Sequence, residues 1–346
     1  MHEALPVVWT SSIGLAVLSL ASLAVLIGAR LYRQQRDARL GVLRKKTASD
    51  LVHYALSGGG LPSIPVRTRH ERDTAIKIAL DAFGIMDEQA RARLTHALSS
   101  VALDTCVRQA ARRGSTPRRI AALEALRLFP GPATRACLEE AQASPSFRIC
   151  LAALRTRVEL GDLPDLDGVL MLTERPEGGR SLSLFRIVEA CVRADLPAAL
   201  VRLTSAPSPR ARIMLLKAIG ATGSWAAFRD VAGASLDPDP EVRAAALIAL
   251  RVMAAPAALA IFAAAIEDPD WQVRLKAVEG IGQLGKPQDR PIVEKLLSDP
   301  VWWIRFRADE ALRRLDGRAA DLRAAHDPPR GRKRRRVMAS GLAAAS

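Results

Sequence analysis

A fixed repeat of 31 residues near the C-terminus limits what this chain can fold into. Each copy holds an Asp-Pro pair, an aliphatic residue followed by arginine, an alanine, and a further aliphatic residue. The aligned positions are Asp237, Asp268 and Asp299; Val242-Arg243, Val273-Arg274 and Ile304-Arg305; Ala246, Ala277 and Ala308; Leu250, Ile281 and Leu312. Such a period is the signature of a repeat protein, in which one supersecondary unit stacks on the next.

The repeat extends towards the N-terminus. Prolines recur with the same 31-residue step at Pro145, Pro176, Pro207, Pro238, Pro269 and Pro300. Arginines that align with the repeat are Arg119, Arg148, Arg212, Arg243, Arg274 and Arg305, with Arg180 the weakest match. Alanine and leucine dominate the apolar residues, which favours helix. We therefore predict an all-α fold, a right-handed α-solenoid of helix pairs.

Each unit has the pattern of helix, turn, helix, turn. Proline after an acidic or small residue ends one helix and suits the first turn of the next. Asp239 and Asp270 stand where an N-cap is needed. The predicted second helices are 133–143, 164–174, 196–205, 225–236, 256–267 and 288–298. After Leu315 we expect a turn at Asp316-Gly317 and a last helix over 318–325.

Residues 66–114 precede the regular repeats and match them poorly. A terminal cap behaves in this way, because its outer face has no neighbour. Apolar periodicity predicts helices over 69–83, 87–100 and about 101–112. Together with this cap, the repeat solenoid is predicted over 66–327. Residues 328–346 are basic and then rich in alanine and serine, so we expect a disordered tail.

The N-terminus carries an uncharged run over residues 7–29. As a helix it would span about 34 Å, enough for a bilayer core of about 30 Å. A cleaved signal peptide is the alternative, but it would need a basic start and a shorter apolar core. Arginines follow the run directly, so the positive-inside rule places residues 1–6 outside and the repeats in the cytoplasm. We expect a single-pass protein of the inner membrane, with the solenoid behind one N-terminal transmembrane helix.

Positive charge concentrates in two short segments. The net charge is +15, and residues 30–46 and 330–336 hold +6 each, so the rest of the chain carries only +3. The basic juxtamembrane segment 30–56 is expected to contact anionic lipid. Its candidate headgroup contacts are Arg30, Arg33, Arg36 and Arg39. Residues 57–65 contain three glycines and two prolines, which predicts a linker. Because the repeats themselves are barely basic, nucleic-acid binding by the solenoid is disfavoured.

The D-P-x-x-x-V-R-x-x-A-x-x-A-L pattern resembles the short HEAT-like repeats first described in phycobilisome bilin lyases. The resemblance covers roughly residues 115–327. The last unit, Asp299 to Leu312, is similar to the closing repeat of bacterial membrane-anchored HEAT-repeat proteins. That resemblance implies a protein partner, and some of those proteins appear alongside membrane glycosyltransferases. Ankyrin and tetratricopeptide repeats are disfavoured, because their characteristic turn and helix motifs are missing.

Motifs that carry catalysis are missing from the sequence. No P-loop, G-x-S-x-G or H-E-x-x-H motif occurs. Gly280, Gly282 and Gly285 form one G-x-G-x-x-G, but Lys286-Pro287 follows, so we expect a turn between two helices. The four cysteines lack a paired spacing and are interpreted as small buried apolar residues. We predict no enzyme activity, no cofactor and no metal site.

The repeated arginines have two interpretations. In the first, each arginine reaches an aspartate such as Asp237, Asp268 or Asp299 of its own or a neighbouring unit, and the column is structural. In the second, the arginines form a stripe that binds a ligand. We favour the structural interpretation.

The tryptophans of the last repeats are candidate partner-binding residues. Trp302 and Trp303 are adjacent on a helix and point about 100° apart, so at least one must be partly exposed. Exposed tryptophan is a frequent anchor of protein interfaces. The candidates are Trp271, Trp302 and Trp303.

These features predict a membrane-tethered, non-enzymatic scaffold whose HEAT-like repeat surface binds a protein partner at the cytoplasmic membrane face. Two alternatives stay open. One is a HEAT-type enzyme, either a lyase or an enzyme that acts on nucleic acid. The other is nucleic-acid binding by the basic tail.

Overall fold

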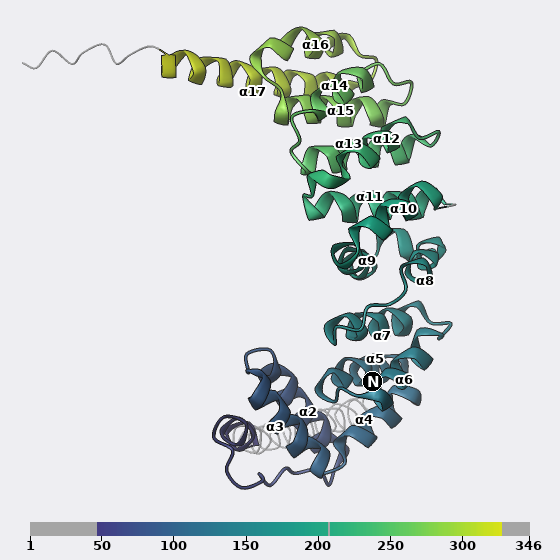
Figure 1. Ribbon diagram of the computed structural model, residues 1–346, viewed down its shortest axis with the longest axis vertical. Coiled ribbons are helices and arrows are strands. Elements are labelled where there is room, and N and C mark those ends of the chain that lie inside the picture. Colours follow the sequence, from purple (N-terminus) through teal and green to yellow (C-terminus); the bar gives the residue numbers. More distant parts are fainter. Residues whose placement is uncertain (1–46, 207, 327–346) are drawn as a thin grey trace, which may run out of the picture. The chain divides into compact units, whose positions relative to one another are not determined.

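A computed structural model describes residues 47–206 and 208–326, and no strand occurs within them (Figure 1). The chain divides into two compact units between Gly161 and Asp162. We describe each unit by itself. The predicted all-α class is confirmed over the described residues, while the right-handed sense of the predicted solenoid stays a prediction.

The N-terminal unit is built from helices joined by short turns. They are residues 47–57, α2 (Arg69–Phe83), α3 (Glu88–Ser100), α4 (Leu103–Arg112), α5 (Thr116–Ala125), the 3-10 turn η1 (Leu126–Leu128), α6 (Pro132–Gln142) and α7 (Phe147–Glu159). Thr68 caps α2 in a reciprocal capping box with Glu71, and Asp87 caps α3. The three predicted helices of the cap region are confirmed, with ends that agree within two residues.

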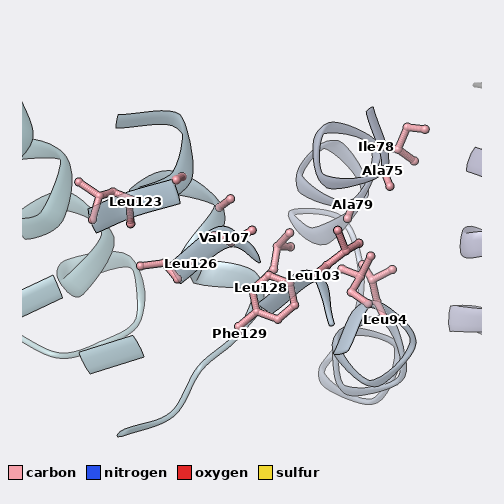
Figure 2. Packing of buried hydrophobic residues seen from close by; sticks show 14 of the residues in the cluster. Ala75, Ile78, Ala79, Leu94, Leu103, Val107, Leu123, Leu126, Leu128 and Phe129 are labelled. Atoms are coloured by element: carbon pink, nitrogen blue, oxygen red, sulfur yellow. The ribbon is translucent and has the colours of Figure 1, made fainter. Parts of the chain in front are cut away.

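Leucines from several helices form the core of this unit (Figure 2). Leu94, Leu103 and Leu123 are fully buried, and Leu51 and Ile64 belong to the same cluster. The guanidinium of Arg93 donates to the carbonyl oxygen of Leu56 at 3.1 Å. Residues before position 66 therefore also contribute to this core. The predicted boundary of the solenoid at 66 stays a prediction.

The C-terminal unit contains the regular repeats. Its elements are α8 (Leu166–Leu170), η2 (Met171–Glu174), η3 (Gly178–Arg180), α9 (Leu182–Ala194), α10 (Leu196–Ser205), α11 (Pro209–Thr222), η4 (Trp225–Ala227), α12 (Phe228–Gly233), η5 (Ala234–Leu236), α13 (Pro240–Val252), α14 (Ala258–Ala265), α15 (Trp271–Leu284), η6 (Pro287–Asp289), α16 (Arg290–Glu294), η7 (Lys295–Ser298) and α17 (Trp302–His326).

Helices α9, α11, α13, α15 and α17 follow one another along this unit, each packed on the next (Figure 1). The shorter helices α10, α12, α14 and α16 each pack on the long helix that follows them in the sequence. We call this C-terminal unit, from α8 to α17, the repeat array. The predicted second helices are present, although 225–236 and 288–298 are short α-helices flanked by 3-10 turns.

The apolar columns of the sequence form the buried faces of the array. Ala246, Ala277 and Ala308 have no exposed surface, and a residue this small lets the neighbouring helix approach closely. Gly280 and Gly282 serve the same purpose inside α15. A Cβ atom at Gly280 would lie 2.6 Å from the ring of Phe262, and one at Gly282 would lie 2.9 Å from Cβ of Ala311. Only Gly285 stands at the helix end, so the expected turn over all three glycines is corrected.

The last helix differs from the sequence prediction. Helix α17 continues through Asp316 and Gly317 without a turn and ends at His326. A glycine inside a helix costs about 1 kcal/mol relative to alanine, and neighbouring contacts offset this cost. Arg318 donates to the carbonyl oxygens of Gly285 and Gln283 at 2.6 and 2.7 Å, and Asp316 pairs with Arg290. These contacts hold the segment of α17 around Gly317 against the preceding unit.

The predicted membrane location is corrected. In the part of the chain that the structure describes, no helix is both long and apolar enough to cross a membrane. This finding overturns the prediction of a single-pass inner-membrane protein, which we do not retain. The predicted segments 1–6 and 7–29, the basic residues 30–46 with Arg30, Arg33, Arg36 and Arg39, and the tail 328–346 lie outside the described residues.

Candidate functional site

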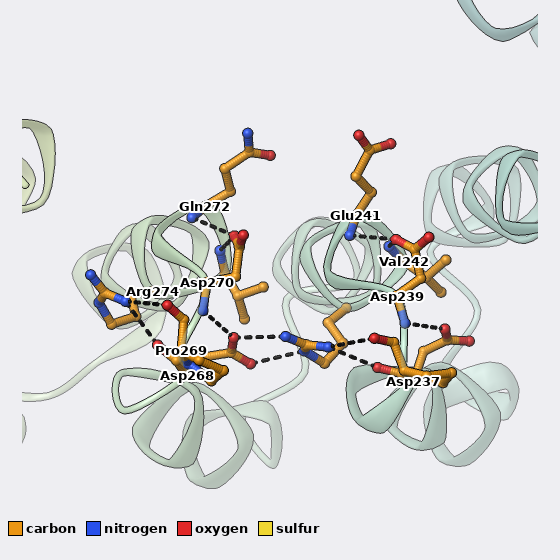
Figure 3. A network of polar contacts seen from close by, with 12 residues as sticks. Asp237, Asp239, Glu241, Val242, Asp268, Pro269, Asp270, Gln272 and Arg274 are labelled. Carbon is orange, nitrogen blue, oxygen red and sulfur yellow. Dashed lines mark hydrogen bonds and ion pairs between the residues drawn. The ribbon is translucent and has the colours of Figure 1, made fainter.

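The Asp-Pro turns prepare the start of each long helix in the array. Asp270 caps α15, because its carboxylate accepts from the N–H groups of Gln272 and Val273. Two residues earlier, Asp268 accepts from the N–H of Asp270 at 2.9 Å. Asp237 and Asp239 repeat this arrangement before α13 (Figure 3). Each turn therefore holds one carboxylate in a fixed position that faces the preceding unit.

Arg243, on the preceding long helix α13, binds the carboxylate of Asp268. Its Nε and Nη2 donate to the two carboxylate oxygens of Asp268 at 2.9 and 2.8 Å. Its Nη1 donates to the carbonyl oxygens of Asp237 and Pro238 at 3.0 and 3.1 Å, so the same side chain also closes its own turn (Figure 3). A two-donor contact of this kind is among the stronger hydrogen bonds in proteins and fixes orientation as well.

The same contact recurs along the array. We call the three pairs Arg212–Asp237, Arg243–Asp268 and Arg274–Asp299 the arginine–aspartate ladder; their closest N–O distances are 3.0, 2.8 and 2.8 Å. Burial of Asp299 opposes its charged form, but the hydrogen bonds from Arg274 and from the N–H of Val301 outweigh it and hold its pKa below the ordinary value. Burial also opposes the charged form of Asp268, but the hydrogen bonds from Arg243 and from the N–H of Asp270 lower its pKa.

Two arginines assigned to the column from sequence do not form ladder pairs with the described side chains. In the ladder the arginine is the fourth residue after the N-cap, as Arg212 is after Ser208. Arg148 is only the second residue after its N-cap Ser146 and is exposed, so it does not belong to the column. Arg119 has the correct position after Ser115, but its Nε donates to the carbonyl oxygen of Ala111 at 2.9 Å.

The ladder ends at Arg305. Its Nη1 donates to the carbonyl oxygens of Asp299 and Pro300 at 2.7 and 3.1 Å, as in the preceding repeats. Among the side chains described, up to residue 320, no carboxylate pairs with its guanidinium. In each ladder pair the aspartate follows its arginine by 25 residues, and 25 residues after Arg305 the sequence has Arg330. At Arg243 the atoms Nε and Nη2 hold the carboxylate. The same two atoms of Arg305 have no carboxylate partner among the described side chains, and we call them the open edge of Arg305.

Three exposed aromatic side chains lie within three residues of Arg305 at the start of α17. Trp302 and Trp303 are each 54% exposed and Phe306 is 47% exposed. The rings of Trp302 and Phe306 stack with centroids 5.4 Å apart, and Trp303 meets Trp302 edge-on at 4.6 Å. We call these three residues the terminal aromatic surface. Both tryptophans that the sequence singled out as a pair are thus exposed and in mutual contact.

Comparison between repeats shows that Trp303 is unusual for its position. The residues 31 and 62 positions earlier are Gln272 and Glu241, both exposed and polar. Phe306 corresponds to the half-buried Leu275. An exposed column that is polar in the other repeats is therefore occupied by the largest apolar side chain at the end of the array.

Two further tryptophans of the described residues are exposed. Trp271 opens α15 and is 40% exposed, and it is not one of the three stacked rings. Trp225, which the sequence reasoning did not single out, is 63% exposed, and its indole N–H donates to the carbonyl oxygen of Met253 at 3.1 Å. An alignment of the repeats would have singled out Trp303, because the two preceding repeats carry the polar residues Gln272 and Glu241 at its position.

A hollow between α15 and α17 has a volume of about 200 Å³. Its charged lining includes Arg307 and Arg314, and both pair with Glu310. No group of three or more His, Cys, Asp or Glu side chains suited to a metal ion occurs within residues 47–206 and 208–326. The cysteines of these residues form no disulfide bond with one another, and burial raises the pKa of the Cys137 thiol.

The C-terminal part of the chain matches a known repeat family. A family model described as HEAT repeats matches residues 259–343. No curated protein matches the chain. Among solved structures, Escherichia coli YibA is 15% identical, with 72% of this chain and 98% of that chain covered and a TM-score of 0.36. Importin beta is 16% identical, with 81% and 42% covered and a TM-score of 0.45. A designed armadillo repeat protein in complex with the peptide (KR)4 is 14% identical, with 77% and 98% covered and a TM-score of 0.25.

Proposed function

We propose that this protein is a non-enzymatic scaffold of HEAT-like repeats that binds a protein partner through the terminal aromatic surface. The single observation that carries the proposal is the exposure of Trp302, Trp303 and Phe306 side by side at the first turn of α17. Membrane attachment is not part of the proposal.

Aromatic side chains of this kind suit an interface. Tryptophan and tyrosine dominate the residues whose truncation weakens protein complexes, and they cluster where water is excluded on binding. Three rings already packed against one another lose little conformational freedom on binding, which favours affinity. A contiguous apolar patch is also costly to leave in water, so a partner that covers it gains free energy from the burial.

The chemistry of the rest of the array supports binding over catalysis. Its strongest polar contacts, the ladder pairs, are engaged within the protein and link one repeat to the next. Two of the arginines that line the hollow beside α17, Arg307 and Arg314, pair with Glu310. Rigid repeats of this type offer a long preformed surface, which suits a scaffold.

The proposal is tested by capture of partners from cells of the source organism with the tagged full-length protein. Trp303→Gln introduces the residue that the preceding repeat carries at the equivalent position, Gln272. The substitution therefore removes the aromatic ring and leaves a side chain that the fold already accepts there. We expect Trp303→Gln combined with Phe306→Ala to lower the captured amount of the main partner at least tenfold. Trp225→Gln is the matched control, because it removes an exposed tryptophan far along the sequence from α17. Equal capture by all three proteins would refute the proposed interface.

A further inference from the structure

We propose that the partner inserts an acidic side chain onto the open edge of Arg305, within a short segment whose apolar residues cover the terminal aromatic surface. This inference rests on the proposed function and names the chemistry of the partner. The atoms concerned are Nε and Nη2 of Arg305, the equivalents of the atoms that hold a carboxylate at Arg243.

The interior repeats show what an arginine at this position binds. At Arg212, Arg243 and Arg274 the same edge of the guanidinium holds an aspartate from the next turn. In each case Nη1 of the arginine is occupied by carbonyl oxygens of its own turn, and Arg305 makes these carbonyl contacts as well. Arg305 is therefore held in the orientation of a ladder arginine, with the remaining edge ready for a carboxylate.

The chain following Arg305 is poorly suited to supply that carboxylate. Helix α17 runs on to His326, which at 1.5 Å per residue lies about 30 Å beyond Arg305. Asp327 comes next, and residues 328–346 contain six basic and no acidic side chains. An acidic group from another molecule fits the open edge better than this basic sequence does.

Other charges near Arg305 on α17 are already neutralised. Arg307 pairs with Glu310 at 2.6 Å, and Arg313 pairs with Asp309. An incoming acidic segment therefore meets one open guanidinium on the same turns of α17 that carry the three aromatic rings. A charged hydrogen bond beside rings that exclude water is stronger than one in open solvent.

The end face of the array limits the size of this segment. Where α13 and α15 present the buried residues Leu247 and Val278, α17 presents Asp309, and where α15 has Gly282, α17 has Arg313. Polar residues at these positions suit the terminal repeat of an array, which has no following unit. A whole further repeat, or the end of a second copy, would bury the Asp309–Arg313 pair. The geometry therefore favours a short segment at the first turn of α17.

The first experiment changes only the ligand. The probe is a fluorescent peptide that copies residues 295–301, Lys-Leu-Leu-Ser-Asp-Pro-Val, blocked at both ends so that its aspartate is the only carboxylate. This sequence contains the aspartate that Arg274 binds inside the array. We expect it to bind the full-length protein, and we expect the version with Asn in place of Asp to bind at least tenfold more weakly. Equal binding of both peptides, or no binding of the Asp peptide at about 1 mM, overturns the proposal.

The second experiment changes the protein. Arg305→Lys keeps the charge and can still donate to the carbonyl oxygens of Asp299 and Pro300, but it lacks the two parallel donors that a carboxylate requires. We expect at least tenfold weaker binding of the Asp peptide and little change for the Asn peptide. Arg148→Lys, at an exposed arginine outside the column, is the matched control and should bind as the unchanged protein does. Circular dichroism confirms that each variant is folded.

The outcomes separate this inference from the proposed function. If Trp303→Gln abolishes capture of the partner while Arg305→Lys leaves capture and peptide binding unchanged, the carboxylate inference is wrong and the proposed function stands. If neither substitution matters, both are wrong. If sedimentation shows that the protein self-associates and that Arg305→Lys abolishes the association, the occupant is a second copy and the inference of a separate partner is overturned.

Discussion

Arg243 and Asp268 join two successive repeats through two parallel hydrogen bonds of 2.9 and 2.8 Å, although 25 residues separate them in the sequence. The same aspartate accepts from the N–H of Asp270, and the same arginine closes the turn that contains Asp237. One pair therefore sets the distance between two turns and fixes the start of α15. The ladder is the polar counterpart of the alanine columns, which set the distance between the helices themselves.

Removal of a ladder aspartate should destabilise the protein. In Asp299→Ala the guanidinium of Arg274 loses its carboxylate and the N–H of Val301 loses its acceptor. We expect a loss of about 2–3 kcal/mol in the free energy of unfolding, measured by urea denaturation. Asp309→Ala removes an aspartate from an exposed ion pair with Arg313 and should cost less than about 1 kcal/mol. Equal losses for the two variants would contradict a structural role of the ladder.

Acid should weaken the array through the same carboxylates. The pKa values of Asp268 and Asp299 are lowered in the folded protein from the ordinary value of 3.8. A lowered pKa contributes stability that is present above the unfolded value and is lost as the pH falls through the folded value. We expect the urea midpoint to fall as the pH drops below about 4. Asp299→Asn should reduce this dependence, whereas an unchanged pH profile in that variant would show that other carboxylates cause it.

The glycines inside α15 should tolerate no added methyl group. In Gly280→Ala the new Cβ would lie 2.6 Å from the ring of Phe262, which is fully buried and cannot move aside easily. We expect a loss of about 1–3 kcal/mol from overpacking, despite the better helix propensity of alanine. Gly233→Ala in α12 meets no atom within 4 Å and is the matched control. A stabilised Gly280→Ala variant would show that α14 and α15 can separate at little cost.

Much of the array follows from spacing alone, because a 31-residue period brings chemically equal positions into equal places. The aspartates that the sequence aligned do meet Arg212, Arg243 and Arg274. Arg148 was assigned by its distance in sequence from the neighbouring arginines of the column. A ladder arginine is instead the fourth residue after the N-cap of its helix, and Arg148 is the second. The sequence does not show the N-cap clearly where the repeat length varies.

The candidate site was less accessible to sequence reasoning. Helical periodicity showed that Trp302 and Trp303 cannot both face the core, but it could not place Phe306 against them. The open edge of Arg305 is defined by contacts among the described side chains, which the sequence alone does not show. The Asp316-Gly317 pair suggested a turn between two helices. The contacts of Arg318 that keep α17 continuous there join residues more than thirty positions apart, so local sequence patterns do not reveal them.

Substitution of Trp303 should separate binding from stability. Its indole is about half exposed, and the preceding repeat carries Gln272 at the same column. Trp303→Gln should therefore change the free energy of unfolding by less than about 1 kcal/mol, apart from the lost contact with Trp302. Urea denaturation of the variant gives this value. A loss of more than about 2 kcal/mol would mean that Trp303 holds the terminal repeat together.

The continuity of α17 predicts an unusual effect at Gly317. This glycine lies inside the helix, and a Cβ atom built on it meets no other atom within 4 Å. Gly317→Ala should therefore stabilise the protein by about 0.5–1 kcal/mol, because alanine loses less backbone entropy in a helix. If the chain turned at Asp316-Gly317 with the glycine in a left-handed conformation, alanine would be strained there and the same substitution would destabilise. The sign of the change in urea midpoint distinguishes the continuous helix from the turn.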